Sequence, residues 1–132
     1  EEGTWTPTIH DALSGGNTAT VGSASGKYVK IGRLVWFNMS VTNIDTTALT
    51  TSEVLHFSLP FQCDETSYTS SFNFDTVNYT DTSFYAFSPT GTFSRGRFIQ
   101  TRDNTTSEYL RENTITDGTS DIRITGTYYT DS

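Results

Sequence analysis

The chain has 132 residues and a formal net charge of −7, with 33% hydrophobic and 14% aromatic residues. This length suits one domain, and we expect residues 1–132 to form a single domain. The eight Lys and Arg residues form no run, which argues against nucleic acid or an anionic membrane surface as a partner. No window reaches the roughly 18 apolar residues of a membrane span, so we expect no membrane insertion.

The single cysteine and the single methionine indicate the compartment in which the protein is made and the kind of polypeptide from which it comes. Cys63 has no second cysteine to pair with, so an intrachain disulfide is excluded, and synthesis in a reducing cytosol is expected. Met39 is the only methionine, so the sequence has no initiator methionine at its first position. We therefore expect the chain to be a domain cut from a longer polypeptide.

The central run of the chain predicts two extended segments that meet at a glycine. Residues 27–31 alternate apolar and polar, and from Val35 to Val41 the odd positions are apolar. This period of two is typical of a strand with one buried face. Gly32-Arg33 between the runs is short enough for a tight turn or a bulge, which favours a hairpin or a bent strand.

The rest of the chain also favours strands. Residues 4–9 are predicted as an edge segment with Trp5 inward, since Pro7 cannot donate to a ladder. In residues 54–61, Leu55 and its odd-numbered neighbours share one face, which leaves His56 on the outer face. Further strands are predicted at 18–21, 68–74, 83–88, 92–101, 108–115 and 122–128, with turns at Asp103-Asn104 and Asp117-Gly118.

The fold class follows from these short segments. No segment repeats apolar residues at helical spacing over three turns, and Ser and Thr are abundant. Eight to ten short antiparallel strands separated by turn signals indicate an all-β protein, either a β-sandwich or a jelly roll. A core of this composition is thin for one domain, so aromatic surface is expected to be buried between subunits.

Four stretches carry a resemblance to a known family. Residues 1–8 read EEGTWTPT and residues 28–35 read YVKIGRLV; FSLPF at 57–61 and IRITGTY at 122–128 extend the likeness. Together they resemble the C-terminal module of bacteriophage tail fibre and tailspike proteins, which carries EGTWTPT-like and YxKIGRxV-like motifs. The family more often has Gly where this chain has Ser58. Residues 62–121 carry no part of the likeness.

The resemblance implies a function and a location. Such proteins are homotrimers whose terminal modules lie at the distal tip of the fibre. It therefore implies a virion protein, made in the host cytoplasm, that acts at the bacterial surface on a polysaccharide or an outer-membrane receptor. Two alternatives stay open: a purely structural trimerisation module without a ligand, and a fragment of a polysaccharide-degrading tailspike.

Enzymatic chemistry and cofactors find little support in the sequence. His10 and His56 belong to no hydrolase motif, and no G-x-S-x-G elbow occurs. The acidic residues lie mainly in turn-like segments, where Asp is favoured for its local hydrogen bonds. We expect no enzyme, no cofactor and no structural metal site, and the sequence leaves open a calcium ion held by loop carboxylates.

A sugar site is the candidate binding function. Carbohydrate sites combine an aromatic ring, which stacks on a sugar, with polar side chains that bond its hydroxyls. Trp36 has outward parity on the central strand, where it could also meet a neighbouring subunit. The other candidate ligand-binding residues lie within an eleven-residue segment that reads largely as a loop: Asp75, Asn78, Tyr79, Asp81 and Tyr85.

Overall fold

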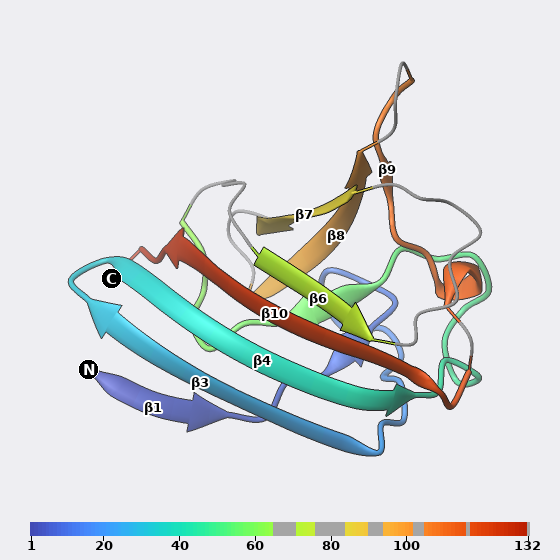
Figure 1. Cartoon of the computed structure of the whole chain (residues 1–132), viewed down its shortest axis with the longest axis horizontal. Coiled ribbons are helices and arrows are strands. Elements are labelled where there is room, and N and C mark those ends of the chain that lie inside the picture. The colour runs from blue at the N-terminus through green and yellow to red at the C-terminus, as the bar shows by residue number, and fades with distance from the viewer. Residues whose placement is uncertain (65–70, 76–83, 90–93, 102–104, 116, 132) are drawn as a thin grey trace.

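The computed structural model describes residues 1–64, 71–75, 84–89, 94–101, 105–115 and 117–131, and the side chains of all of these except 71–75, 84–89, 100 and 101. The described residues form ten strands and one short 3₁₀ helix, η1 (Glu112–Thr114). The strands make two antiparallel sheets that enclose one core (Figure 1). This arrangement confirms the predicted all-β sandwich.

Each sheet has five strands. Sheet A runs in the order β1 (Glu2–Trp5), β3 (Ser23–Ile31), β4 (Leu34–Ile44), β10 (Ser120–Tyr129) and β6 (Ser71–Asp75). Sheet B runs in the order β2 (Ile9–His10), β5 (His56–Ser58), β8 (Arg95–Thr101) and β7 (Phe84–Pro89), and β9 (Glu108–Tyr109) also pairs with β8. The last strand, β10, therefore lies beside β4, although most of the chain separates them in sequence.

The central run forms a hairpin, the first of the two predicted forms. Strands β3 and β4 pair from Ser23 to Ile31, and Gly32-Arg33 is a two-residue turn between Ile31 and Leu34. Gly32 has a φ of 59°, which a type II′ hairpin turn needs at its first turn position and which glycine adopts without strain. The hairpin thereby sets the register of the two strands at the middle of sheet A.

The core lies between the sheets and uses the predicted faces. In β4, Val35, Phe37, Met39 and Val41 are fully buried, as their period-two pattern predicted. Strand β10 repeats the pattern beside it, with alternate residues buried from Ser120 to Tyr128. The other core side chains come from both sheets and the loops between them and include Ile9, Ala19, Ile44, Leu49, Leu55, Phe57, Leu59, Cys63, Phe98, Leu110 and Ile115.

Two glycines make room for aromatic rings across the β1–β3 pair. Gly3 lies opposite Tyr28, and Trp5 lies opposite Gly26. A Cβ atom at Gly26 would come 2.5 Å from the Trp5 indole, and one at Gly3 would come 2.5 Å from the Tyr28 hydroxyl. Each ring therefore lies over the glycine of the opposite strand, which gives a packing reason for part of the EGTW and GKY sequences.

Four strands are shorter than predicted, and two of them are interrupted by a proline. The predicted strand 4–9 is two strands, β1 and β2, which belong to different sheets and are separated at Pro7. The strand predicted at 54–61 is reduced to His56–Ser58, with Pro60 just beyond it. Residues 18–21 form only isolated bridges, and most of 108–115 is irregular or 3₁₀.

Parts of other predictions lie outside the described residues. The strand predicted at 68–74 is described only from Ser71, and the one at 92–101 only from residue 94. The turn predicted at Asp103-Asn104 also lies outside the described part. The Asp117-Gly118 turn is described, and Gly118 has the positive φ of 77° that such a turn favours.

His56 lies on the outer face of its strand, as predicted, but it is buried there. Its side chain points away from the core, and only 5% of its surface is exposed. Strand β5 is an inner strand, so His56 lies between His10 of β2 and Arg97 of β8. Burial, the dominant cause, and the positive charge of Arg97 lower the pKa of His56 from 6.5 to about 4.

This buried histidine predicts a loss of stability in acid. The unfolded chain binds a proton at His56 near pH 6.5, whereas the folded chain binds it only near pH 4, so acid favours unfolding. We expect His56 to lower the free energy of unfolding by about 3 kcal/mol between pH 7 and pH 4. Urea titrations of the wild type and His56→Gln across this range measure the effect. Equal pH slopes for the two proteins would contradict it.

Candidate functional site

Trp36 lies on the outer face of sheet A, as its parity predicted. Its neighbours in β4, Val35 and Phe37, are buried, while 41% of the Trp36 side chain is exposed. Across the sheet, Trp36 lies opposite Val29 of β3 on one side and Thr127 of β10 on the other. The tryptophan therefore stands on the middle strand of sheet A, close to the hairpin turn.

An apolar surface surrounds Trp36, and we call it the Trp36 patch. Ile31 is 74% exposed and the other members are each more than a third exposed; the patch consists of Val29, Ile31, Leu34, Trp36 and Tyr129. They are neighbours by register, since Ile31 lies opposite Leu34, and Leu34 lies opposite Tyr129. A contiguous group of large exposed apolar side chains is typical of an interaction surface.

A shallow trough of about 370 Å³ adjoins the patch. It runs from strand β1 across β3 to Trp36 and is lined by Glu2, Gly3, Thr4, Lys27, Tyr28, Val29 and Trp36. Trp36 and Val29 belong to both the trough and the patch. The trough thus joins an aromatic ring to a carboxylate, an ammonium group and a hydroxyl, which suits either a sugar or the polar rim of a protein interface.

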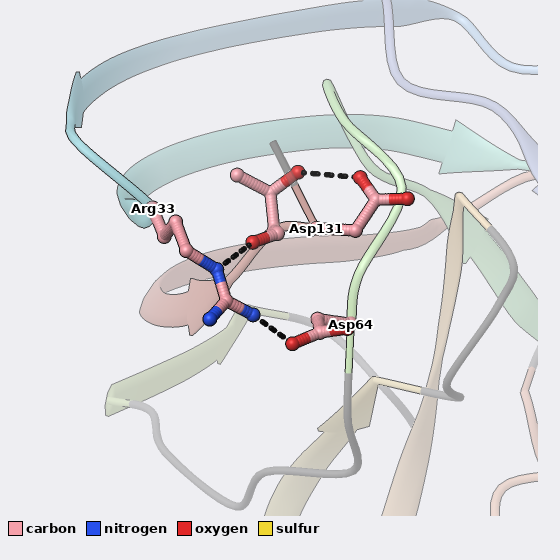
Figure 2. A network of polar contacts seen from close by, with 4 residues as sticks. Arg33, Asp64 and Asp131 are labelled. Carbon is pink, nitrogen blue, oxygen red and sulfur yellow. Dashed lines mark hydrogen bonds and ion pairs between the residues drawn. The ribbon is translucent and has the colours of Figure 1, made fainter.

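The hairpin turn beside the patch is fastened to the end of the chain (Figure 2). Arg33 Nε donates a hydrogen bond of 2.9 Å to the Thr130 carbonyl, and its guanidinium forms an ion pair with Asp64. Backbone bonds of 2.9 Å from Thr130 N–H to the Arg33 carbonyl and from Asp64 N–H to the Tyr129 carbonyl support this contact. The network holds Ile31, Leu34 and Tyr129 at one end of sheet A.

The structure separates the predicted sugar-site residues that it describes. Asp75 is the last residue of β6 rather than a loop residue, and it lies opposite Asp121. Asp121 and Thr127, the partner of Trp36, are six residues apart along β10, or about 20 Å. Tyr85 belongs to β7 in sheet B. Asn78, Tyr79 and Asp81 lie outside the described residues, so their role in binding stays a prediction.

Metal binding, membrane insertion and cysteine chemistry were also considered for the described residues. Among them, no group of three or more His, Cys, Asp and Glu side chains could hold a metal ion. No helix within the described ranges is long and apolar enough to cross a membrane. Cys63 is buried in the core, and burial raises the pKa of its thiol, so this cysteine suits packing rather than nucleophilic chemistry.

One cluster was missed by sequence reasoning. Both histidines of the chain, with Arg95 and Arg97, meet on the outer face of sheet B. The alternation of Arg95 and Arg97 shows that these two share a face, but the pairing of β2, β5 and β8 cannot be read from the sequence. The scattered basic residues, which argued against anionic partners, are therefore partly gathered by the fold.

The two sheets and their Trp36 patch define an antiparallel β-sandwich with an exposed apolar sheet face. No protein-family model matches the sequence, and no curated protein matches it. Among solved structures, the fold is similar to part of the crystal structure of Dettilon tailspike protein (gp208), with a TM-score of 0.72 and 14% sequence identity. The match covers 98% of this chain and 23% of that one. At this identity the likeness establishes a shared fold.

Proposed function

We propose that the chain is a domain from the C-terminal part of a phage tail fibre or tailspike. The observation that carries the proposal is the likeness in fold to Dettilon tailspike protein over 98% of this chain. The EEGTWTPT and YVKIGRLV motifs support it independently, because they were identified from the sequence alone. The protein would be made in the host cytoplasm, become part of the virion tail and act at the bacterial surface.

In this proposal the domain forms a homotrimer through the Trp36 patch. Five large apolar side chains share one outer face of sheet A, in a chain with only 33% hydrophobic residues. Burial of such side chains against sister chains is favourable by about 25 cal/mol for each Å² removed from water. The hairpin turn fastened by Arg33 supplies a rigid edge for this contact.

Host recognition is the second part of the proposal. The domain would lie at the distal tip and bind a bacterial surface polysaccharide or an outer-membrane receptor, without catalysing a reaction. Loops on a rigid sandwich commonly carry binding. The segment that contains Asn78, Tyr79 and Asp81 supplies the aromatic and polar groups that a glycan site needs.

The assembly role predicts that a charge in the Trp36 patch prevents trimer formation. Trp36→Asp would place a carboxylate in the buried contact, and we expect a monomer where the wild type is a trimer, measured by light scattering. Ser40→Asp is the matched control, because Ser40 lies on the same strand and face but outside the patch. A Trp36→Asp trimer as stable as the wild type would exclude this face as the interface.

The recognition role predicts that aromatic side chains near residue 80 contribute to adsorption. We expect Tyr79→Ala combined with Tyr85→Ala to weaken adsorption to host cells about thirtyfold, since each ring would contribute roughly 1 kcal/mol of stacking. The mass by light scattering serves as the control for assembly. Unchanged adsorption by an intact trimer would favour the purely structural trimerisation module.

The remaining alternative is an enzyme fragment. Glycoside hydrolysis commonly needs two carboxyl groups roughly 5 to 10 Å apart on either side of the sugar bond. We expect the purified 132-residue domain to release no reducing ends from host capsule, in an assay calibrated with a known depolymerase. Reducing ends released above the background of a heat-denatured sample would establish the enzymatic alternative.

A further inference from the structure

The outer face of sheet B carries a row of basic side chains. His10, His56 and Arg97 lie directly opposite one another on β2, β5 and β8. Arg95 precedes Arg97 by two residues in β8 and shares its face. A chain of net charge −7 therefore gathers both of its histidines and two arginines on one face, where an anion would meet two guanidinium charges.

Two nitrogen atoms in this row are buried without a hydrogen-bond partner. They are Nδ1 of His56 and Nε of Arg97. The His56 side chain is only 5% exposed, so leaving this nitrogen without a hydrogen bond costs free energy. The groups that act on His56 are Arg97, Arg95, His10 and the Val54 carbonyl, of which only the carbonyl favours a proton on the imidazole. Unpaired buried polar atoms often mark a site where a ligand, ion or water binds.

The Arg97 guanidinium is held against an aromatic ring. Its carbon lies 4.2 Å from the centre of the Tyr109 ring, and this cation–π contact fixes the position of the group. A carboxylate suits the N–H donors of a guanidinium, because its two oxygens accept parallel hydrogen bonds.

The neighbouring groups have other partners. Arg95 donates hydrogen bonds to the carbonyls of Ala12 and Gly15. The ring of His10 contacts the hydroxyls of Thr8 and Thr18. The nearby carboxylate of Asp11 accepts hydrogen bonds from Asn17 and from the backbone N–H of Thr50. Within the described ranges, Arg97 makes a cation–π contact with the Tyr109 ring, and no acid forms an ion pair with Arg97 or His56.

We propose that Arg97 and His56 form a binding site for the carboxylate of an acidic sugar, with His10 and Arg95 supplying additional positive charge. The carboxylate would accept two hydrogen bonds from the Arg97 guanidinium and one from the His56 imidazolium. The choice of an acidic sugar as the source of the carboxylate rests on the proposed role in glycan recognition. The anion site itself rests on the geometry of sheet B alone.

Proton uptake on binding follows from this arrangement. Burial and the adjacent arginines keep the unliganded His56 neutral near pH 7 by lowering its pKa. A bound carboxylate next to the imidazole would favour its charged form, so binding would take up a proton and grow stronger as the pH falls toward 6.

The test is an NMR titration of the wild-type domain with D-glucuronate at pH 6.5. The chain has only two histidines, so two sets of imidazole signals report on the site, and His10→Gln assigns them. We expect saturable shifts of the His56 signals with glucuronate and none with D-glucose. We expect Arg97→Gln to weaken binding about tenfold or more, since it removes a charge-assisted bidentate contact.

Three further measurements decide the result. Arg97→Lys keeps the charge but not the planar fork, so it should fold and still bind more weakly, whereas Arg123→Gln on sheet A should bind as the wild type does. Glucuronate binding that leaves the His56 signals unmoved, or phosphate binding without glucuronate binding, would overturn the proposal. The titration needs neither trimer nor host cell, so its failure is distinct from failure of the tail-fibre role.

Discussion

Five aromatic rings hold one end of the sandwich together, and the hairpin, the first strand and the last strand all depend on them. Ring contacts run from Phe61 to Tyr28 at 4.9 Å, on to Trp5 at 6.5 Å, to Phe37 at 6.1 Å and to Tyr128 at 5.9 Å. The Tyr128 hydroxyl then donates to the Phe61 carbonyl and accepts from its N–H, both at 3.1 Å. The series closes on itself, so a short chain of low hydrophobic content obtains a packed core from a few large side chains.

This way of building the core explains the contrast between the two outer faces. Large rings fill the interior from strands β1, β3, β4 and β10, and the opposite face of the same strands carries the Trp36 patch. Sheet B has short strands, and its outer face carries the basic row instead. One face is thus suited to apolar contact between chains and the other to an anion, which allows assembly and recognition to occupy different surfaces.

The candidate sites were predictable only in part. The outward position of Trp36 follows from alternation in β4, and the structure confirms it. The patch around Trp36 was not foreseen, because Tyr129 joins it through the pairing of β10 with β4, between residues more than 80 positions apart. His56 was placed outside for the right geometric reason, yet it is buried, because its exposure depends on which strands flank β5.

Alternation in β3, β4 and β10, the turn-forming Gly32 and the absence of helical spacing were enough to establish the all-β class, because these signals are local to each strand. Tertiary structure decided which strands are neighbours and hence which side chains share a surface. A proline such as Pro7 predicts where a strand ends, but it does not predict which sheet the next strand joins. The pairing of β2, β5 and β8, which brings His10, His56 and Arg97 into one row, is long-range, and no spacing within the sequence encodes it.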